Sequence, residues 1–186
     1  MEKVLVYTLV GAAIISAQKL EFALLGAISH LSHLPEAKSD KRFRDLTPEK
    51  FLRGNPEDLK VTFGQMKAHF GEKLLISGDE LNKLIKDRNL VAHSYWRLTE
   101  TNIKDACKLT DPETFLVDFI NRCEKWGHIF RGLVYSFQKA VAEKDGRQSE
   151  VKFNEQQEQD IKAYQAHAAL VMQLRANNNN SSGYHA

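Results

Sequence analysis

The 186-residue chain has little cysteine and little proline. Its two cysteines, Cys107 and Cys123, are too few for a disulfide framework and do not have the spacing of a metal site. This usage predicts a cytoplasmic protein. The four prolines, at 35, 48, 56 and 112, fall at or near the ends of apparent helices, which suits an all-helical chain. The sequence also lacks glycine-rich phosphate loops, serine-nucleophile elbows and Cys/His zinc patterns.

The chain also lacks a large excess of charge of either sign. The chain carries 26 basic and 24 acidic residues, a formal net charge of +2 at pH 7. That balance does not indicate nucleic-acid binding by itself, so a basic surface would have to arise by local clustering. With 42% hydrophobic and 27% charged residues, the composition is that of a soluble globular protein long enough for one domain with a substantial core.

The N-terminal part of the chain contains a long uncharged segment, from Val4 to Gln18. A signal peptide is disfavoured, since Glu2 weakens the positive start and cleavage after Ala17 would place Ile15 where a small residue is needed. The run is also shorter than the roughly 18 residues that a membrane span requires. We therefore predict a buried core helix over about residues 3–33, with no membrane partner.

Hydrophobic residues recur at helical spacing along the rest of the chain, and no strand-period segment or internal repeat stands out. The pattern predicts an all-α, up-and-down bundle of four to five main helices, with residues 1–175 as one domain and 176–186 as a disordered Asn/Ser-rich tail. After a loop at 34–47, further helices are expected from Thr47-Pro48, from Pro56 to about Phe70, from Ser77 or Asp79 as the cap, from Asp111-Pro112 to about Glu143, and over about 154–175.

Residues 88–95, Arg-Asn-Leu-Val-Ala-His-Ser-Tyr, are the most informative stretch. On one continuous helix, Asn89 and His93 share a face and Arg88 nearly eclipses Tyr95, so the four polar side chains would lie within one half of the helix surface. Arginine offers a bidentate fork for phosphate. Histidine can take and give a proton near neutral pH.

This set of residues suits RNA cleavage through the 2′-hydroxyl. A base must take the 2′-OH proton, an acid must protonate the 5′-oxygen, and a cation must steady the charge at phosphorus. His93 fits the acid–base role and Arg88 the charge-stabilising role, with Asn89 orienting the phosphate or the histidine. One copy holds a single such histidine. A second copy across an isologous dimer interface would supply the other.

The motif resembles that of the HEPN superfamily. That family's usual pattern is Arg-x4–6-His with a polar residue after the arginine, and Arg88-Asn89-Leu90-Val91-Ala92-His93 matches it in full. The extension His93-Ser94-Tyr95 is similar to the toxin branch encoded beside minimal nucleotidyltransferases.

The resemblance implies a HEPN-like helical bundle and a metal-independent endoribonuclease that needs no cofactor. Its composite site would form at a homodimer interface, and its products would carry 2′,3′-cyclic phosphate and 5′-OH ends. Many such proteins serve in toxin–antitoxin or phage-defence systems. By this resemblance Tyr95 lines the site, and it is the residue that a nucleotidyltransferase-type antitoxin would modify with AMP.

Basic residues elsewhere are candidates for tracking an RNA backbone. They come from the segment Lys38–Arg44 and from the region of the motif, and the candidates are Lys41, Arg42, Arg44, Lys86 and Arg97, with Lys83 nearby. Trp96 is a candidate for stacking on a base. The alternative interpretations are a solvated helix face for the charges and a core or interface position for the tryptophan.

Other interpretations stay open at this stage. Residues 88–95 could be a solvated helix face, or the chain could be a catalytically silent HEPN-like module for binding or dimerisation. His30 and His33, three residues apart, could ligate a metal, although histidines near a helix C-terminus also favour the helix dipole without one. Glu21 on the first helix is a candidate for orienting Arg88.

Overall fold

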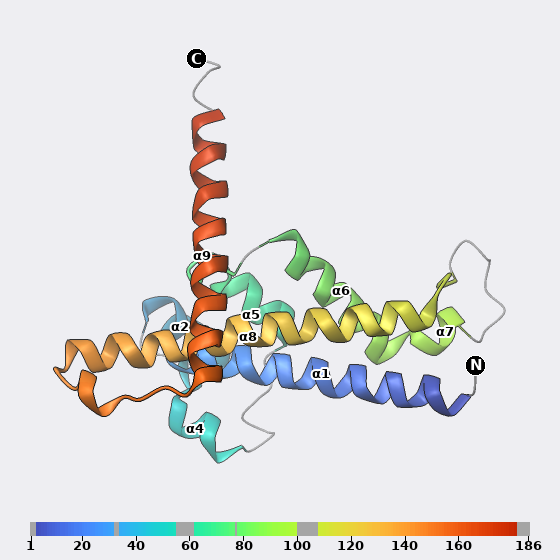
Figure 1. Cartoon of the computed structure of the whole chain (residues 1–186), viewed down its shortest axis with the longest axis horizontal. Coiled ribbons are helices and arrows are strands. Elements are labelled where there is room, and N and C mark those ends of the chain that lie inside the picture. Colours follow the sequence, from blue (N-terminus) through green and yellow to red (C-terminus); the bar gives the residue numbers. More distant parts are fainter. Residues whose placement is uncertain (1–2, 32–33, 55–61, 77, 100–107, 182–186) are drawn as a thin grey trace. The chain divides into compact units, whose positions relative to one another are not determined.

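The computed structural model describes residues 3–31, 34–54, 62–76, 78–99 and 108–181 (Figure 1). These residues are mostly helical and contain no strand, which confirms the predicted all-α class. The helices in chain order are α1 (Lys3–Ser29), α2 (Pro35–Ser39), α3 (Lys41–Arg44), α4 (Pro48–Arg53), α5 (Phe63–Phe70), α6 (Asp79–His93), α7 (Tyr95–Thr99), α8 (Pro112–Lys144) and α9 (Glu155–Ser181), with a 3₁₀ turn at Gln148–Glu150 before α9.

The chain forms two compact units, and the long helices α1 and α8 contribute to both. Unit 1 comprises Met1–Phe22 and Gly78–Gly127. Unit 2 comprises Ala23–Ser77 and His128–Ala186. The motif at 88–95 therefore belongs to unit 1, and α9 belongs to unit 2.

The core of unit 1 comes from one face each of α1, α6 and α8. Its buried residues recur three or four positions apart, as an amphipathic helix requires; they include Ala13, Ala17 and Leu20 of α1, Leu81, Leu84 and Val91 of α6, and Leu116, Phe119, Cys123 and Trp126 of α8. Burying each large side chain contributes about 1.5–3 kcal/mol. Burial also raises the pKa of the Cys123 thiol to about 12, which makes it an inert core residue.

The core of unit 2 combines aliphatic side chains with two pairs of aromatic rings. Phe43 of α3 meets Phe70 of α5 edge to face, with ring centroids 4.9 Å apart. Phe63 of α5 meets Phe130 of α8 in the same way at 6.2 Å. Such pairs contribute about 0.5–1.5 kcal/mol beyond the burial of their area.

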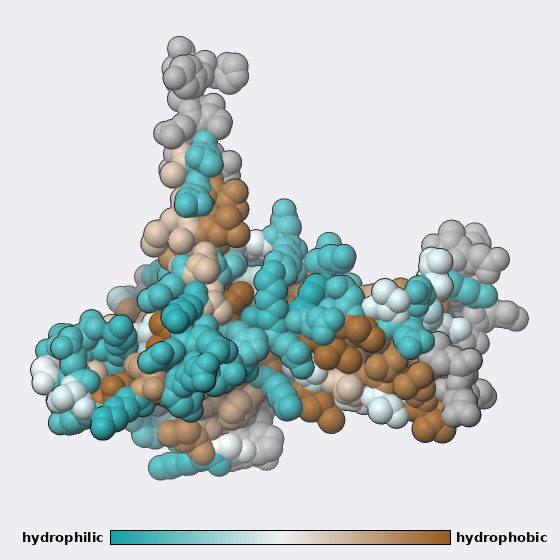
Figure 2. All heavy atoms as spheres, viewed as in Figure 1, coloured by the Kyte–Doolittle hydropathy of each residue, from teal (hydrophilic) through white to brown (hydrophobic). Residues whose placement is uncertain are grey.

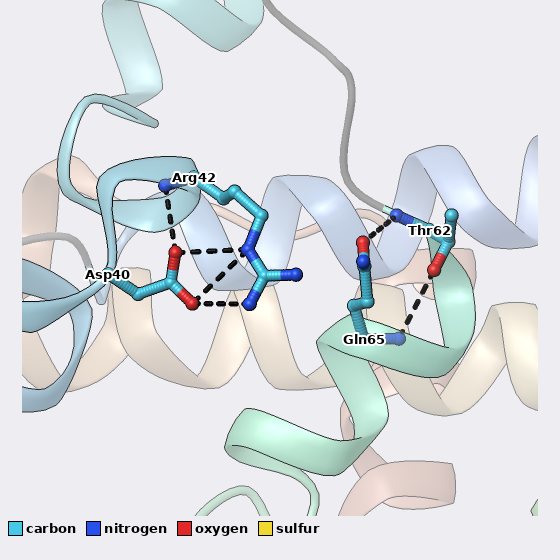
Figure 3. A network of polar contacts seen from close by, with 4 residues as sticks. All are labelled: Asp40, Arg42, Thr62 and Gln65. Carbon is cyan, nitrogen blue, oxygen red and sulfur yellow. Dashed lines mark hydrogen bonds and ion pairs between the residues drawn. The ribbon is translucent and has the colours of Figure 1, made fainter.

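Local capping explains where the short helices of unit 2 begin. The Thr47 side chain accepts a hydrogen bond from the Lys50 backbone N–H at 3.3 Å, and Pro48 follows it as predicted. At α5, Thr62 and Gln65 form a reciprocal capping box that satisfies two backbone donors (Figure 3). The helix start predicted at Pro56 lies outside the described residues.

The predicted loop at 34–47 is wrong, because α2 and α3 lie within it. Pro35 at the first helical turn starts α2, and the Asp40 side chain caps α3 by accepting a hydrogen bond from the Arg42 backbone N–H. α1 ends at Ser29, before the predicted residue 33.

The later helix boundaries agree in part with the prediction. Gly78 occupies the N-cap position of α6, so Asp79 is its first residue instead of its cap. Asp111 caps α8 by accepting a hydrogen bond from the Thr114 backbone N–H, as the Asp-Pro-Glu pattern predicted. α9 continues to Ser181, past the predicted end at 175 and into the segment expected to be a disordered tail.

α1 also has the length and composition of a membrane span. Val4–Ser29 has a mean hydropathy of 1.4, and about a third of that stretch is buried. Core helices of soluble proteins and signal sequences can have the same length and composition, so these two properties are weak evidence for a membrane location.

Candidate functional site

The centre of the candidate site is an ion pair between α1 and α6, both within unit 1. The Arg88 Nε lies 2.6 Å from the Glu21 Oε1, and both side chains are about three-quarters buried. This contact confirms the predicted pairing of Glu21 with Arg88. The contact is made through Nε, so the Nη groups of Arg88 are left for other partners.

Asn89 contacts this pair, and His93 follows four residues after it on the same helix. The Arg88 Nη1 donates a hydrogen bond of 3.1 Å to the Asn89 Oδ1. Asn89 and His93 are four residues apart and both are exposed, so they share a face of α6 that solvent or a ligand can reach. The structure therefore places Arg88, Asn89 and His93 along the last two turns of α6.

Tyr95 does not belong to that face, which corrects the prediction of one continuous helix over 88–95. α6 ends at His93, because Ser94 adopts the C-cap conformation with φ −136° and ψ −2°, and α7 begins at Tyr95. The bend turns Tyr95 into the core of unit 1, where it is 7% exposed. Trp96 next to it is 58% exposed and is available for contacts.

A second set of polar contacts holds α6 against α8. The Arg122 Nη2 donates to the Asp87 Oδ2 at 2.7 Å, and its Nε donates to the Asp118 Oδ2 at 2.9 Å. Glu80 and Lys125 add an exposed pair at 2.8 Å. Asp87 immediately precedes Arg88, so this network fixes the turn of α6 that carries the site. The sequence analysis did not predict this network. The feature that could have indicated it is Arg122, an arginine among the apolar positions of α8.

The five basic residues predicted to contact RNA do not form one group in the structure. Two of them have acidic partners, and the other three are divided between unit 1 and unit 2. The Arg42 guanidinium forms a bidentate pair with Asp40, at 2.6 Å for Nη2 to Oδ2, and the Asp40 pKa falls to about 2 as a result (Figure 3). Arg44 lies 3.6 Å from Asp45. Lys41, Lys86 and Arg97 are exposed, but Lys41 is in unit 2 and the other two are in unit 1.

The structure adds no ligand to the metal site considered for His30 and His33. His33 lies outside the described residues, and the part of the chain that the structure describes holds no group of three or more His, Cys, Asp or Glu side chains that could bind a metal ion. His30 is half-buried, and this burial lowers its pKa while Glu49 partly opposes the shift.

A further polar cluster, which sequence reasoning missed, joins α8 to α9 within unit 2. Asp160 is buried and its carboxylate contacts the His128 Nδ1 at 2.5 Å and accepts from the Arg131 Nε at 2.9 Å. Burial raises the pKa of Asp160, but these hydrogen bonds outweigh it and hold the pKa below its usual value. Gly132 lies at the same crossing, where a Cβ would overlap the backbone oxygen of Asp160. We read this cluster as a clamp between two helices.

Comparisons with family models, with curated proteins and with solved structures found no match for this chain.

Proposed function

We propose that the chain is a metal-independent endoribonuclease of HEPN type, with a HEPN-like bundle and a composite active site at a homodimer interface. The observation that carries the proposal is the Glu21–Arg88 ion pair. It fixes a guanidinium that donates to the exposed Asn89, and the exposed His93 follows four residues after Asn89 on the same helix. A fixed cation near an acid–base side chain supports a site that binds and cleaves a phosphodiester.

The proposed reaction needs only groups of this kind. His93 of one copy takes the proton of the 2′-hydroxyl, and the 2′-oxygen attacks phosphorus. As the P–O5′ bond breaks, His93 of the second copy gives a proton to the leaving 5′-oxygen. The products are a 2′,3′-cyclic phosphate and a 5′-hydroxyl, and the second histidine is necessary because one copy cannot be both base and acid in a single step.

Arg88 and Asn89 hold the phosphate in this scheme. A guanidinium has five N–H donors. Glu21 and Asn89 engage Nε and Nη1, so further donors remain to bind the non-bridging oxygens as charge develops on them. Glu21 acts through Arg88 and is a positioning residue.

An apolar stripe on α1 supports the second copy. The exposed side chains Val4, Tyr7, Ile14, Ile15 and Phe22 fall on one side of the helix, and Figure 2 shows hydrophobic side chains along the N-terminal part of α1. Their recurrence at spacings of three, seven and eight residues is typical of a helix that packs against another helix. The stripe ends next to Glu21, so a partner packed on it would lie near the site.

The biological setting follows the resemblance and remains part of the proposal. The substrate is RNA, the location is the cytoplasm, and the role is in toxin–antitoxin or phage defence. The burial of Tyr95 adds a condition: a nucleotidyltransferase-type antitoxin reaches the Tyr95 hydroxyl only after α7 has moved out of the core.

The competing function is a catalytically silent HEPN-like module for binding or dimerisation. In such a module the Glu21–Arg88 pair would serve only to hold α1 against α6, with no phosphate bound at the guanidinium. Expression in a bacterial host separates the two functions. We expect growth arrest with the wild type and none with Arg88→Ala or His93→Ala, whereas Asn82→Ala, an exposed change on the same helix, leaves the arrest intact. Equal growth with all four chains would contradict the toxin role.

A further inference from the structure

A cavity of about 560 Å³ lies within unit 2, apart from the residues proposed for RNA cleavage. It is bounded by the chain just after α1, by the last turns of α8 and by the turn before α9; its walls include His30, Leu31, Phe137, Lys144, Arg147 and Val151. Its volume is within the range of small-molecule sites, which is roughly 300–1,000 Å³.

The inner walls of the cavity are apolar. Leu31 is buried, and the Phe137 ring lies 6.4 Å from the His30 imidazole in a tilted arrangement. Ala142 and Val151 complete this lining. An aliphatic tail would gain free energy here by leaving water, because the surfaces that it meets are hydrocarbon.

Two basic side chains, Lys144 and Arg147, line the same cavity. Lys144 is exposed and has no ion-pair partner in the described part of the chain. Arg147 pairs with Asp145 at 2.8 Å and approaches Glu150 at 3.9 Å, so its charge is largely compensated. The described lining residues include no carboxylate. One uncompensated cation suits a head group with a single negative charge.

His30 adds a proton-dependent donor to this arrangement. Its burial lowers its pKa, while Glu49 of α4 favours its charged form. Lys144 lines the same cavity and adds positive charge, whereas the charge of Arg147 is opposed by Asp145 and Glu150. A carboxylate bound beside the imidazole would favour the protonated histidine and raise its pKa.

We propose that this cavity binds an amphiphilic monocarboxylate, a fatty-acid-like molecule with its tail against Leu31 and Phe137 and its head group at Lys144 and His30. A polyphosphate matches the lining less well, since Lys144 is the lining lysine or arginine without an ion-pair partner in the described part of the chain. The site is independent of the proposed nuclease, because none of its residues belongs to unit 1.

Calorimetric titration of the full chain with decanoate, below its micelle-forming concentration, tests the site. We expect saturable binding of one decanoate, weakened at least about tenfold by Lys144→Glu and blocked by Ala140→Trp, which fills the cavity from an exposed position. Lys139→Glu is the matched control, because Lys139 is exposed on the same helix and does not line the cavity; it should bind as the wild type does.

The head group and the proton are tested separately. Decanol should bind at least tenfold more weakly than decanoate, and NMR should show the pKa of His30 rising when decanoate is bound. Equal affinity for decanol would overturn the carboxylate assignment. Absence of saturable binding, or the same affinity in wild type, Lys144→Glu and Ala140→Trp, would overturn the site.

Discussion

The carboxylate of Glu21 and the guanidinium of Arg88 meet at 2.6 Å, although the segment Ala23–Ser77, which belongs to unit 2, lies between them in sequence. Both side chains are largely buried, so the pair is shielded from solvent screening more than a surface ion pair would be. Removal of either partner leaves the other charge partly buried and uncompensated.

A charge swap separates the structural and catalytic roles of this pair. Glu21→Arg and Arg88→Glu should each lower the free energy of unfolding by about 1–3 kcal/mol, because each places like charges together. The double variant should regain most of that stability. Its RNA cleavage should nevertheless stay at least about 10²-fold below wild type, since the guanidinium is no longer on α6.

Urea unfolding and RNA cleavage measured on the same four proteins check this prediction. Recovery of both stability and cleavage in the double variant would show that Arg88 has no specific role in the chemistry.

Tyr95 should behave as a core residue. Tyr95→Ala removes a buried ring and should cost about 3–5 kcal/mol of stability, whereas Trp96→Ala at the exposed neighbour should cost less than about 0.5 kcal/mol. Thermal unfolding of the two variants gives the comparison. A small loss with Tyr95→Ala would mean that the phenol faces solvent and is open to modification.

The apolar stripe of α1 should mediate self-association. Ile15→Glu and Phe22→Glu each place a charge on a surface that a second copy would bury, so both should shift the protein to monomer and abolish cleavage. Leu52→Glu alters a hydrophobic residue that is 79% exposed in unit 2 and should leave the dimer unchanged. Analytical ultracentrifugation distinguishes the species. A wild-type chain that is monomeric and still cleaves RNA would rule out the composite site.

Asp160 should make the protein acid-sensitive. Its folded-state pKa lies below that of the unfolded chain, so its contribution to stability is present above about pH 4 and is lost as the pH falls through the folded-state pKa. Asp160→Asn should therefore lower the unfolding free energy by about 1–3 kcal/mol at pH 7, and the difference from wild type should shrink at pH 3.

Chemical unfolding at the two pH values measures this effect. Glu158→Gln, an exposed change on the same helix, is the control and should show little loss at pH 7. A difference between wild type and Asp160→Asn that does not depend on pH would argue against an ionised Asp160 in the clamp.

Local patterns predicted the helices well where a strong signal was present. Thr47-Pro48 and Asp111-Pro112 each start a helix in the structure, because a capping side chain and a proline act within one turn. The loop predicted over 34–47 failed for a related reason: Asp40 is itself a cap, and the polar residues around it obscured that signal.

Tertiary contacts explain what the sequence could not predict. The bend at Ser94 has no proline or glycine to mark it, and it exists because burial of the Tyr95 ring favours the turn. The Asp87–Arg122 and His128–Asp160 pairs join residues far apart in the chain, and no spacing rule connects them. Glu21 could be proposed because it was an acidic residue on a mostly apolar helix.

The most direct test of the account is cleavage of RNA by the purified protein in the presence of EDTA, with the chemistry of the product ends determined. We predict cleavage that leaves 2′,3′-cyclic phosphate and 5′-hydroxyl ends, and a loss of at least about 10²-fold in His93→Ala at unchanged thermal stability, because His93 is exposed. Cleavage that disappears in EDTA, or a His93→Ala variant that cuts as fast as wild type, would contradict the proposed mechanism.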